Sequence, residues 1–436
     1  MRRRRPVAGG TRRRRLPAVG GVIQRSRLGS GLEVVTEAVP TAASVSLGAW
    51  VGTGSRDETP QSSGASHFLE HLLFKGTSTW SARAIAEAMD AVGGDFNAFT
   101  TKEYTAFYVH LLGEDLALGL DILCDVVWSA SLRPEDVDAE RQVILEEILM
   151  RGDDPADLAH ESLGAAMFPR HALGRDILGV ASSIEAMSAT GIRRFHHRHY
   201  RPENVVLAAA GALDHDEVVR GVDARFAGQP GGRRPSRRPP AQPGGGLTVT
   251  TRPTEQAHLA VGMPAPCRHD ERRWATELLN HVLGGGLSSR LFQEIRERRG
   301  LAYSVYSDWS PFEDAGVLSV YAGTAPGHVE QVAALVRTEL DRLAEEGITP
   351  RELEVARGAL RAQTLLSLED SGARMSRVGR STLLFDEALS ATHVIERLDA
   401  VTLDEIRQVA GSVLGAPRTA AVVGPFDADR LAGLEV

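Results

Sequence analysis

The chain has 436 residues, of which 42% are hydrophobic and 5% aromatic. This length predicts two or three domains, and the hydrophobic content is sufficient for packed cores. The formal net charge of −8 argues against nucleic acid as the main partner. No stretch approaches 18 consecutive apolar residues, so we expect no membrane-spanning helix and a cytoplasmic protein. The two cysteines, Cys124 and Cys267, are far apart, which argues against a disulfide framework.

The first 21 residues begin with MRRRRPVAGGTRRRRL, which contains eight arginines. No apolar run follows these arginines, so the segment fits neither a signal peptide nor a membrane anchor. We expect residues 1–21 to form a disordered basic tail. A weak contact with phosphate or with an acidic surface is the alternative.

The motif HxxEH is formed by His67, Glu70 and His71 within residues 64–76. On a helix, residues four apart share one face and their Cβ atoms lie about 5–6 Å apart. Two neutral imidazoles at this spacing can bind one tetrahedral Zn²⁺. Glu70 projects beside the pair, where it can accept a proton from water instead of binding the metal. The order reverses HExxH and matches the inverzincin pattern. A polar helix with two unrelated histidines is the alternative.

A catalytic zinc usually has three protein ligands, and the segment LRPEDVDAERQVILEEILM (132–150) offers the third. It predicts a helix, because Pro134 suits a first turn and apolar residues recur at helical spacing. Glu140 and Glu147 are seven residues apart and therefore lie on one stripe of this helix. We predict that Glu147 completes the metal shell and that Glu140 orients a ligand from behind. Two solvated helix glutamates are an equally open alternative.

The remaining patterns predict alternating strands and helices. Strand patterns occupy residues 45–52 and 257–264, and helical patterns occupy residues 115–129 and 327–345. The sequence FNAFT after Gly93-Gly94 predicts a further strand. Strands with helices on one face predict the α+β class. His196, His197 and His199 have no acidic residue nearby in sequence, so we expect a solvated helix end there.

Residues 227–246 are rich in Pro, Gly and Arg, which predicts an exposed linker. The linker would separate a first domain at 22–226 from a second domain at 247–436. These halves look like repeats of each other. The matching segments are 132–147 with 348–363 (without gaps), 203–214 with 418–427, and 93–100 with 299–307.

The second half lacks the metal residues of the first. When the two halves are aligned, Gln363 corresponds to Glu147, and ATELL (275–279) corresponds to HFLEH, with the register open by about one residue. We therefore expect the chemistry in the first half, while the second half supplies binding surface.

Several long segments resemble the pitrilysin (insulinase) family of zinc metallopeptidases, in particular its shorter members, which include the mitochondrial processing peptidase and its bacterial relatives. The likeness begins with HFLEHLLFKGT and the glutamate of VILEEI, and it covers nearly the whole chain from about Val22 onward. The other matching segments are NAFTTKEYTAFYVHLL (97–112), HALGRDILG (171–179), HYRPENVVLAAAG (199–211) and LGGGLSSRLFQEIRERRGLAYSVYS (283–307).

This resemblance implies two homologous αβ-roll domains related by internal duplication, each with a mainly antiparallel sheet covered by helices. It implies that His67, His71 and Glu147 are the ligands of one zinc ion per chain and that Glu70 is the general base. It also implies that the strand containing Asn97, Ala98 and Phe99 is an edge strand to which a peptide substrate adds. An ordinary edge strand is the alternative.

The resemblance assigns roles to two residues of the second half, Arg296 and Tyr303. The tyrosine would donate a hydrogen bond to the oxyanion, and the arginine would hold the substrate backbone. From the residues alone they are a helix arginine and a strand tyrosine. Arg298 and Arg299 are rivals that only the resemblance separates from Arg296.

We therefore expect a zinc-dependent endopeptidase that cleaves unfolded peptides or leader-like segments. A homodimer is expected, with a heterodimer of related chains as another possibility. The alternative is a catalytically silent or partner-dependent subunit of a heterodimeric processing peptidase. Neither nucleic acid nor a membrane is an expected partner.

Overall fold

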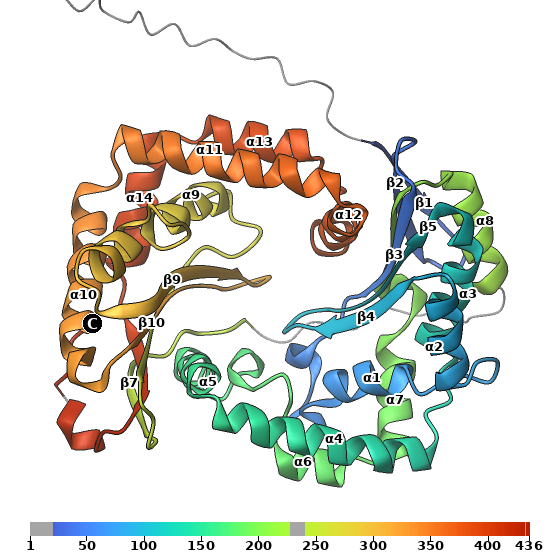
Figure 1. Ribbon diagram of the computed structural model, residues 1–436, viewed down its shortest axis with the longest axis horizontal. Coiled ribbons are helices and arrows are strands. Elements are labelled where there is room, and N and C mark those ends of the chain that lie inside the picture. Colours follow the sequence, from blue (N-terminus) through green and yellow to red (C-terminus); the bar gives the residue numbers. More distant parts are fainter. Residues whose placement is uncertain (1–20, 227–239, 432) are drawn as a thin grey trace, which may run out of the picture.

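The computed structural model describes residues 21–226, 240–431 and 433–436. The basic tail predicted for the N-terminus (except residue 21) and residues 227–239 of the predicted linker lie outside this range. Within it, two sheets with covering helices face one another (Figure 1). None of the helices in the described ranges combines the length and the apolar composition that crossing a bilayer requires. The proposed domain boundaries stay predictions.

The first sheet has six strands in the spatial order β1-β2-β6-β3-β5-β4. Strands β2 and β6 pair in parallel, and the other neighbours pair antiparallel. Strand β4 lies at one edge of the sheet. The strands are β1 (Val22–Arg27), β2 (Glu33–Ala38), β3 (Ser44–Val51), β4 (Asp95–Thr100), β5 (Thr105–Leu112) and β6 (Val205–Gly211).

The second sheet has five strands in the order β7-β11-β8-β10-β9, with one parallel pair, β7 and β11. Apart from β1, its order repeats that of the first sheet strand by strand, and the parallel pair recurs at the same place. The predicted class, two related and mainly antiparallel sheets, is therefore confirmed. The strands are β7 (Gly246–Thr251), β8 (Ala257–Pro264), β9 (Ala302–Pro311), β10 (Gly316–Thr324) and β11 (Thr419–Gly424).

One face of each sheet carries its own half's helices and a large apolar core. Helix α1 lies between β4 and α4 and packs against both (Figure 1). In the first half the helices are α1 (Ala65–Leu73), α2 (Ala82–Ala91), α3 (Leu116–Ser129), α4 (Pro134–Asp153), α6 (Ala181–Ala186), α7 (Ala189–His199) and α8 (His215–Phe226). In the second half they are α9 (Arg273–Leu283), α10 (Val329–Glu346), α11 (Pro350–Leu366), α13 (Ala391–Ala400) and α14 (Leu403–Leu414).

The other face of each sheet is covered by a helix from the opposite half. Helix α12 (Ser371–Phe385), of the second half, packs on β3 and β6, where Met375 and Val378 join the core around Trp50. Helix α5 (Pro155–Met167), of the first half, packs on β8 and β11 through Leu163 and Met167. Because α5 follows α4 and α12 follows α11, the two halves exchange equivalent helices.

A buried ion cluster joins the β4–β5 hairpin to the second half. Glu103 accepts from Arg56 Nη1 at 2.6 Å, from the guanidinium of Arg268, and from the backbone N–H of Glu313 at 3.2 Å. Arg56 Nη2 also donates to Asp314 at 2.7 Å. This hairpin end is therefore held against the tip of the β9–β10 hairpin.

The prediction of a solvated helix end at His196–His199 is wrong for two of the three histidines. His196 and His199 are buried at the end of α7, and only His197 is exposed. The His196 ring donates from Nε2 to the Val127 carbonyl at 2.8 Å. The helical period turns these two rings inward, His196 toward α3 and His199 toward Thr53. The absence of acidic neighbours in sequence gives no information about such burial.

Candidate metal centre

The start of α1 is fixed by a buried carboxylate. Glu58 accepts hydrogen bonds from the backbone N–H groups of Gly64 and Ser66, each at 2.8 Å. Gly64 has φ +91°, a left-handed conformation that glycine adopts without steric cost. These two N–H groups lie at the helix end, where backbone donors have no partner within the helix.

The apolar residues of α1 decide where its histidines point. Phe68, Leu69 and Leu72 are buried in the first core, so one face of the helix packs inward. His67 and His71, four residues apart, therefore lie together on another face, and both are only partly buried. The predicted helix and the predicted shared face are both present.

Glu147, from α4, meets the two imidazoles. The Nε2 atoms of His67 and His71 are 3.3 Å apart, and Glu147 Oε2 lies 3.6 Å and 3.5 Å from them. Ligand atoms around a tetrahedral zinc with bonds of about 2.0–2.2 Å lie about 3.4 Å from one another. Among the described residues, these three form the one group of His, Cys, Asp or Glu side chains close enough to hold a metal ion. The donor set and spacing fit zinc.

Glu140, also from α4, stands behind His71. Its Oε1 lies 2.9 Å from His71 Nδ1, and its Oε2 lies 2.5 Å from Lys75 Nζ. Burial opposes ionisation of Glu140, but the hydrogen bonds from Lys75 and His71 outweigh it and lower the pKa. A carboxylate on Nδ1 fixes the tautomer that leaves Nε2 free to bind a metal. The sequence did not single out Lys75 as part of this arrangement.

The imidazole of His67 is held neutral. Burial, and then the neighbouring His71, lower the pKa of His67 to about 4. A neutral ring has the lone pair that metal binding requires. At neutral pH the ring is therefore already in the protonation state of a ligand.

Glu70 stands apart from the three-residue cluster and is held by β4. Thr100 Oγ1 donates to Glu70 Oε2 at 2.6 Å. Burial raises the pKa of Glu70, and the Thr100 hydrogen bond partly opposes this. A carboxylate with a raised pKa beside a metal centre suits a general base. Thr100 was missed as a site residue, although its place at the end of the predicted strand FNAFT was visible in the sequence.

Strand β4 has a free edge next to this carboxylate. Among the described strands, it pairs only with β5. Asn97 is exposed, and its Oδ1 accepts from the Ala98 N–H at 2.8 Å. Phe99 points to the opposite core, with its ring 5.8 Å from that of Trp50. The edge therefore leads from Asn97 directly to Thr100 and Glu70.

Arg296 and Tyr303 are brought together with each other but not with the metal cluster. The Arg296 guanidinium lies 4.8 Å from the centre of the Tyr303 ring, and Tyr303 is 79% exposed. Arg298 and Arg299 instead pair with Glu294. Among the described residues, no hydrogen bond or ion pair joins Arg296 or Tyr303 to the HxxEH residues or Glu147.

Helices α1 and α9 are equivalent in the two halves, and their buried residues show which position of one corresponds to which position of the other. In α1 they are 65, 66, 68, 69, 72 and 73, and in α9 they are 275, 276, 278, 279, 282 and 283. The counterpart of HFLEH is therefore ELLNH (277–281), two residues after the predicted ATELL. Glu277 takes the place of His67, and Gln363 of α11 takes the place of Glu147. This register correction leaves one His of the motif, His281, in the second half.

Comparison with known families gives two matches. Residues 33–181 match the family model described as Insulinase (Peptidase family M16). Residues 186–360 match the model described as Peptidase M16 inactive domain. The second range contains α9, where Glu277 takes the place of His67.

Relatives described as uncharacterized zinc proteases align over most of the chain. One from Streptomyces coelicolor is 48% identical over 414 residues, which are 93% of this chain and 90% of the relative. One from Mycobacterium tuberculosis is 47% identical and covers 95% of this chain and 96% of its own length. One from Bacillus subtilis is 38% identical, with 93% and 98% covered.

Solved structures share the fold at lower identity. A protease from Helicobacter pylori superposes with a TM-score of 0.89 at 22% identity, covering 93% of this chain and all of the other. A structure from Pseudomonas fluorescens, described as a peptidase M16 inactive domain, gives 0.85 at 21% identity, with 93% and 98% covered.

Proposed function

The chain belongs to the insulinase family (peptidase family M16), and on this premise we propose that it is a zinc-dependent endopeptidase that cleaves unfolded polypeptides. The observation that supports this most is the meeting of His67, His71 and Glu147 at distances of 3.3–3.6 Å. The relatives' description as zinc proteases supports the metal and the reaction class.

The residues around the cluster fit the parts of a hydrolytic mechanism. A zinc ion held by the three ligands would act as a Lewis acid, polarising a carbonyl and making water more acidic. Glu70 would take the proton of the attacking water and pass it to the leaving amine. Thr100 holds one oxygen of Glu70, so the carboxylate keeps its orientation. Glu140 keeps the His71 ring in place from the opposite side.

The free edge of β4 supports an extended polypeptide as substrate. A peptide that adds to this edge would bind mainly through its backbone, which makes little demand on sequence. Asn97 and Ala98 would face it, and it would pass Thr100 beside the base. Unfolded chains offer extended segments whose backbone groups are all free to pair, so unfolded or leader-like segments are the proposed substrates.

The exposed pair Arg296 and Tyr303 supports an assembly of two chains. Within the chain they do not contact the cluster, so we propose that a second copy presents them to the substrate. A homodimer would supply two complete sites. A related partner chain is the alternative, in which case this chain would be inactive alone.

The test is hydrolysis of a mixed peptide library by the purified protein, with cleavage sites determined by mass spectrometry. Cleavage should occur, should stop with a chelator and should return with added zinc. The Glu70→Gln protein controls for contaminating peptidases. A protein that binds zinc but cleaves nothing would instead support the silent or partner-dependent subunit.

A further inference from the structure

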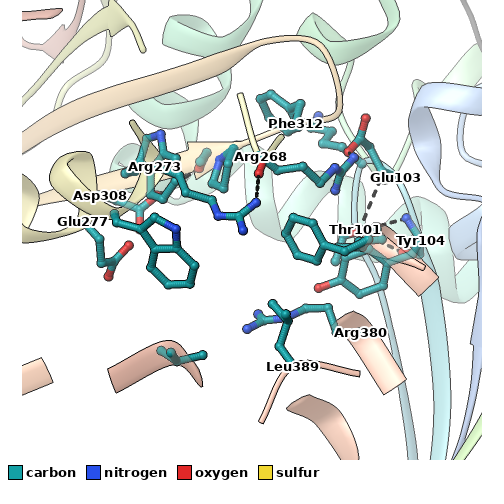
Figure 2. A pocket seen from close by; sticks show the side chains of 18 of the residues that line it. Thr101, Glu103, Tyr104, Arg268, Arg273, Glu277, Asp308, Phe312, Arg380 and Leu389 are labelled. Carbon is teal, nitrogen blue, oxygen red and sulfur yellow. Dashed lines mark hydrogen bonds and ion pairs between the residues drawn. The ribbon is translucent and has the colours of Figure 1, made fainter. Parts of the chain in front are cut away.

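A cavity of about 850 Å³ lies between the two halves (Figure 2). Its walls come from α9, α11, α12 and α13, from the end of β9, and from the β4–β5 hairpin. It includes Thr100, the residue that holds Glu70. The cavity therefore adjoins the proposed active site at Thr100.

By the internal duplication, this cavity is the second half's counterpart of the metal centre. The metal residues stand on α1 and α4 beside β4, and the equivalent elements α9, α11 and β9 form walls of the cavity. Glu277, in the place of His67, and Gln363, in the place of Glu147, both line it. The second half therefore has a pocket at the position of the metal centre, but other side chains stand where the first half has its proposed metal ligands.

Glu277 lines this pocket without a directly bound partner among the described residues. Its carboxylate makes no hydrogen bond or ion pair within the part of the chain that the structure describes. Burial, and then the nearby Asp308, raise the pKa of Glu277, while Arg380 lowers it. A bound cation would stabilise the ionised carboxylate that burial disfavours.

The arginines of the cavity do not neutralise Glu277. Arg268 is bound to Glu103. Arg273 donates to the Arg268 carbonyl at 2.8 Å, and its guanidinium stacks over the rings of Trp274 and Phe385 at 4.7 Å and 4.9 Å. Arg380 enters from another wall than Glu277 (Figure 2). Its charge reduces the attraction of Glu277 for a cation, and the carboxylate of Asp308, which also lines the cavity, increases that attraction.

We propose that this cavity is a second binding site for the polypeptide substrate, and that Glu277 there pairs with an arginine or lysine side chain of the bound peptide. This rests on the proposed peptidase function and adds a substrate contact outside the metal centre. An extended peptide on β4 reaches the cavity by passing Thr100 and Thr101, which line its near wall. Trp309, which also lines it and has no arginine of the described residues over its ring, offers apolar surface for the stem of a long basic side chain.

Binding can be measured without hydrolysis in the Glu70→Gln protein. The probes are N-acetylated, amidated dodecapeptides of Ala, Ser and Gly in which one arginine is moved along the sequence and compared with norleucine. Titration calorimetry should find a position where arginine tightens binding about ten- to a hundredfold, the usual range for a charge-assisted contact. Adding Glu277→Gln should abolish this preference. Glu255→Gln, which removes the same charge at an exposed site, should keep it.

A charge reversal separates a binding role from a structural one. The Glu277→Lys protein should bind the peptide with glutamate at this position more tightly than the peptide with arginine. Thermal unfolding would verify that the variants are folded. An arginine preference that survives Glu277→Gln would overturn the site. Because these titrations do not require cleavage, a failed peptidase assay with intact Glu277-dependent binding would count against the proposed function alone. Cleavage without this preference would count against the second site alone.

Discussion

Glu70 and Glu147 are glutamates beside the same pair of imidazoles, but different contacts hold them. Glu147 Oε2 lies within 3.6 Å of both Nε2 atoms, whereas Glu70 is bound by Thr100. We propose the first as the arrangement of a ligand and the second as that of a group held ready to accept a proton. Amide substitutions should therefore have different consequences at the two positions.

Replacing Glu70 by glutamine should leave the zinc content unchanged, because Glu70 is outside the three-residue cluster. Hydrolysis should fall by about 10²–10⁴, the usual contribution of a positioned acid–base group. Zinc analysis and peptide turnover of the same preparation measure both effects. Glu146→Gln, at an exposed position of α4, is the control and should change neither. Normal turnover in the Glu70 variant would rule out its role as base.

Glu147→Gln should lose most of its zinc, since an amide is a poor substitute for a carboxylate ligand. Glu140→Gln should retain the site but bind zinc about 10–100-fold more weakly, because it orients His71 without touching the metal. Competition with a chromophoric chelator gives both affinities. Equal zinc affinity in Glu147→Gln and the parent protein would place the third ligand elsewhere.

His196 predicts a pH dependence of stability that is independent of the metal cluster. Burial lowers the pKa of His196 to about 4, whereas an unfolded histidine titrates near 6.5. Between these values the unfolded chain binds the extra proton, so protonation favours unfolding. The contribution is complete above pH 6.5 and is lost as the pH falls toward 4. It amounts to on the order of 3 kcal/mol for a shift of this size.

The test compares urea unfolding of three chelator-treated proteins between pH 7 and pH 4. His196→Gln should be less stable than the parent protein at pH 7, and the difference should shrink as the pH falls. His197→Gln, which changes the exposed neighbour on the same helix, should follow the parent curve. A constant difference for His196→Gln across this range would show that the buried ring does not titrate as proposed.

At the level of elements, the exchanged helices make each half part of the other's core. Helix α12 lies close to β3 and β6 because Gly379 has no side chain. A Cβ there would overlap Trp50 Nε1 and lie 2.8 Å from Ala208 Cβ. Neither the indole nor the strand can move freely, since both are buried.

Gly379→Ala should therefore destabilise the protein although alanine favours helix formation by about 1 kcal/mol. Overpacking of a buried contact costs roughly 1–3 kcal/mol and should prevail. Gly358→Ala in α11 is the matched control, because a Cβ added there would meet no atom within 4 Å and only the helix preference remains. Denaturant unfolding should show opposite signs for the two substitutions. The same sign for both would mean that α12 can shift on the sheet.

At the scale of the whole molecule, the metal residues lie in one half and the exposed pair Arg296 and Tyr303 in the other. Mixing the Glu70→Gln and Tyr303→Phe proteins tests whether two chains share a site. In a mixed dimer with shared sites, one site carries both lesions and the other carries neither, so activity should partly return. Loss of one oxyanion donor costs about 2.7–4 kcal/mol, so the recovery should exceed the background.

Subunit exchange must be verified with two affinity tags, since unmixed homodimers would also show no recovery. If tagged subunits exchange and activity stays at the level of the separate variants, the residues act within one chain or not at all. Recovery only on adding a related partner protein would favour the heterodimer.

Short-range patterns in the sequence determined most elements and the shared face of His67 and His71, whereas the resemblance to the family assigned Glu147 to the cluster. The i, i+4 spacing placed His67 and His71 on one helical face, and the seven-residue spacing placed Glu140 and Glu147 on one stripe. The repeated segments likewise predicted two related sheets. The inferences about helix faces succeeded because helical periodicity acts over a few residues and does not depend on how distant segments pack.

Only the tertiary structure decided the contacts between distant segments. It showed that Thr100 and Lys75 support Glu70 and Glu140, that His196 and His199 are buried, and that α5 and α12 are exchanged between the halves. It also moved the counterpart of HFLEH by two residues, because the burial pattern of α9 fixes a register that sequence similarity left open. The physical reason is common to all of these: burial and cross-half packing depend on which surfaces meet, and no local pattern encodes that.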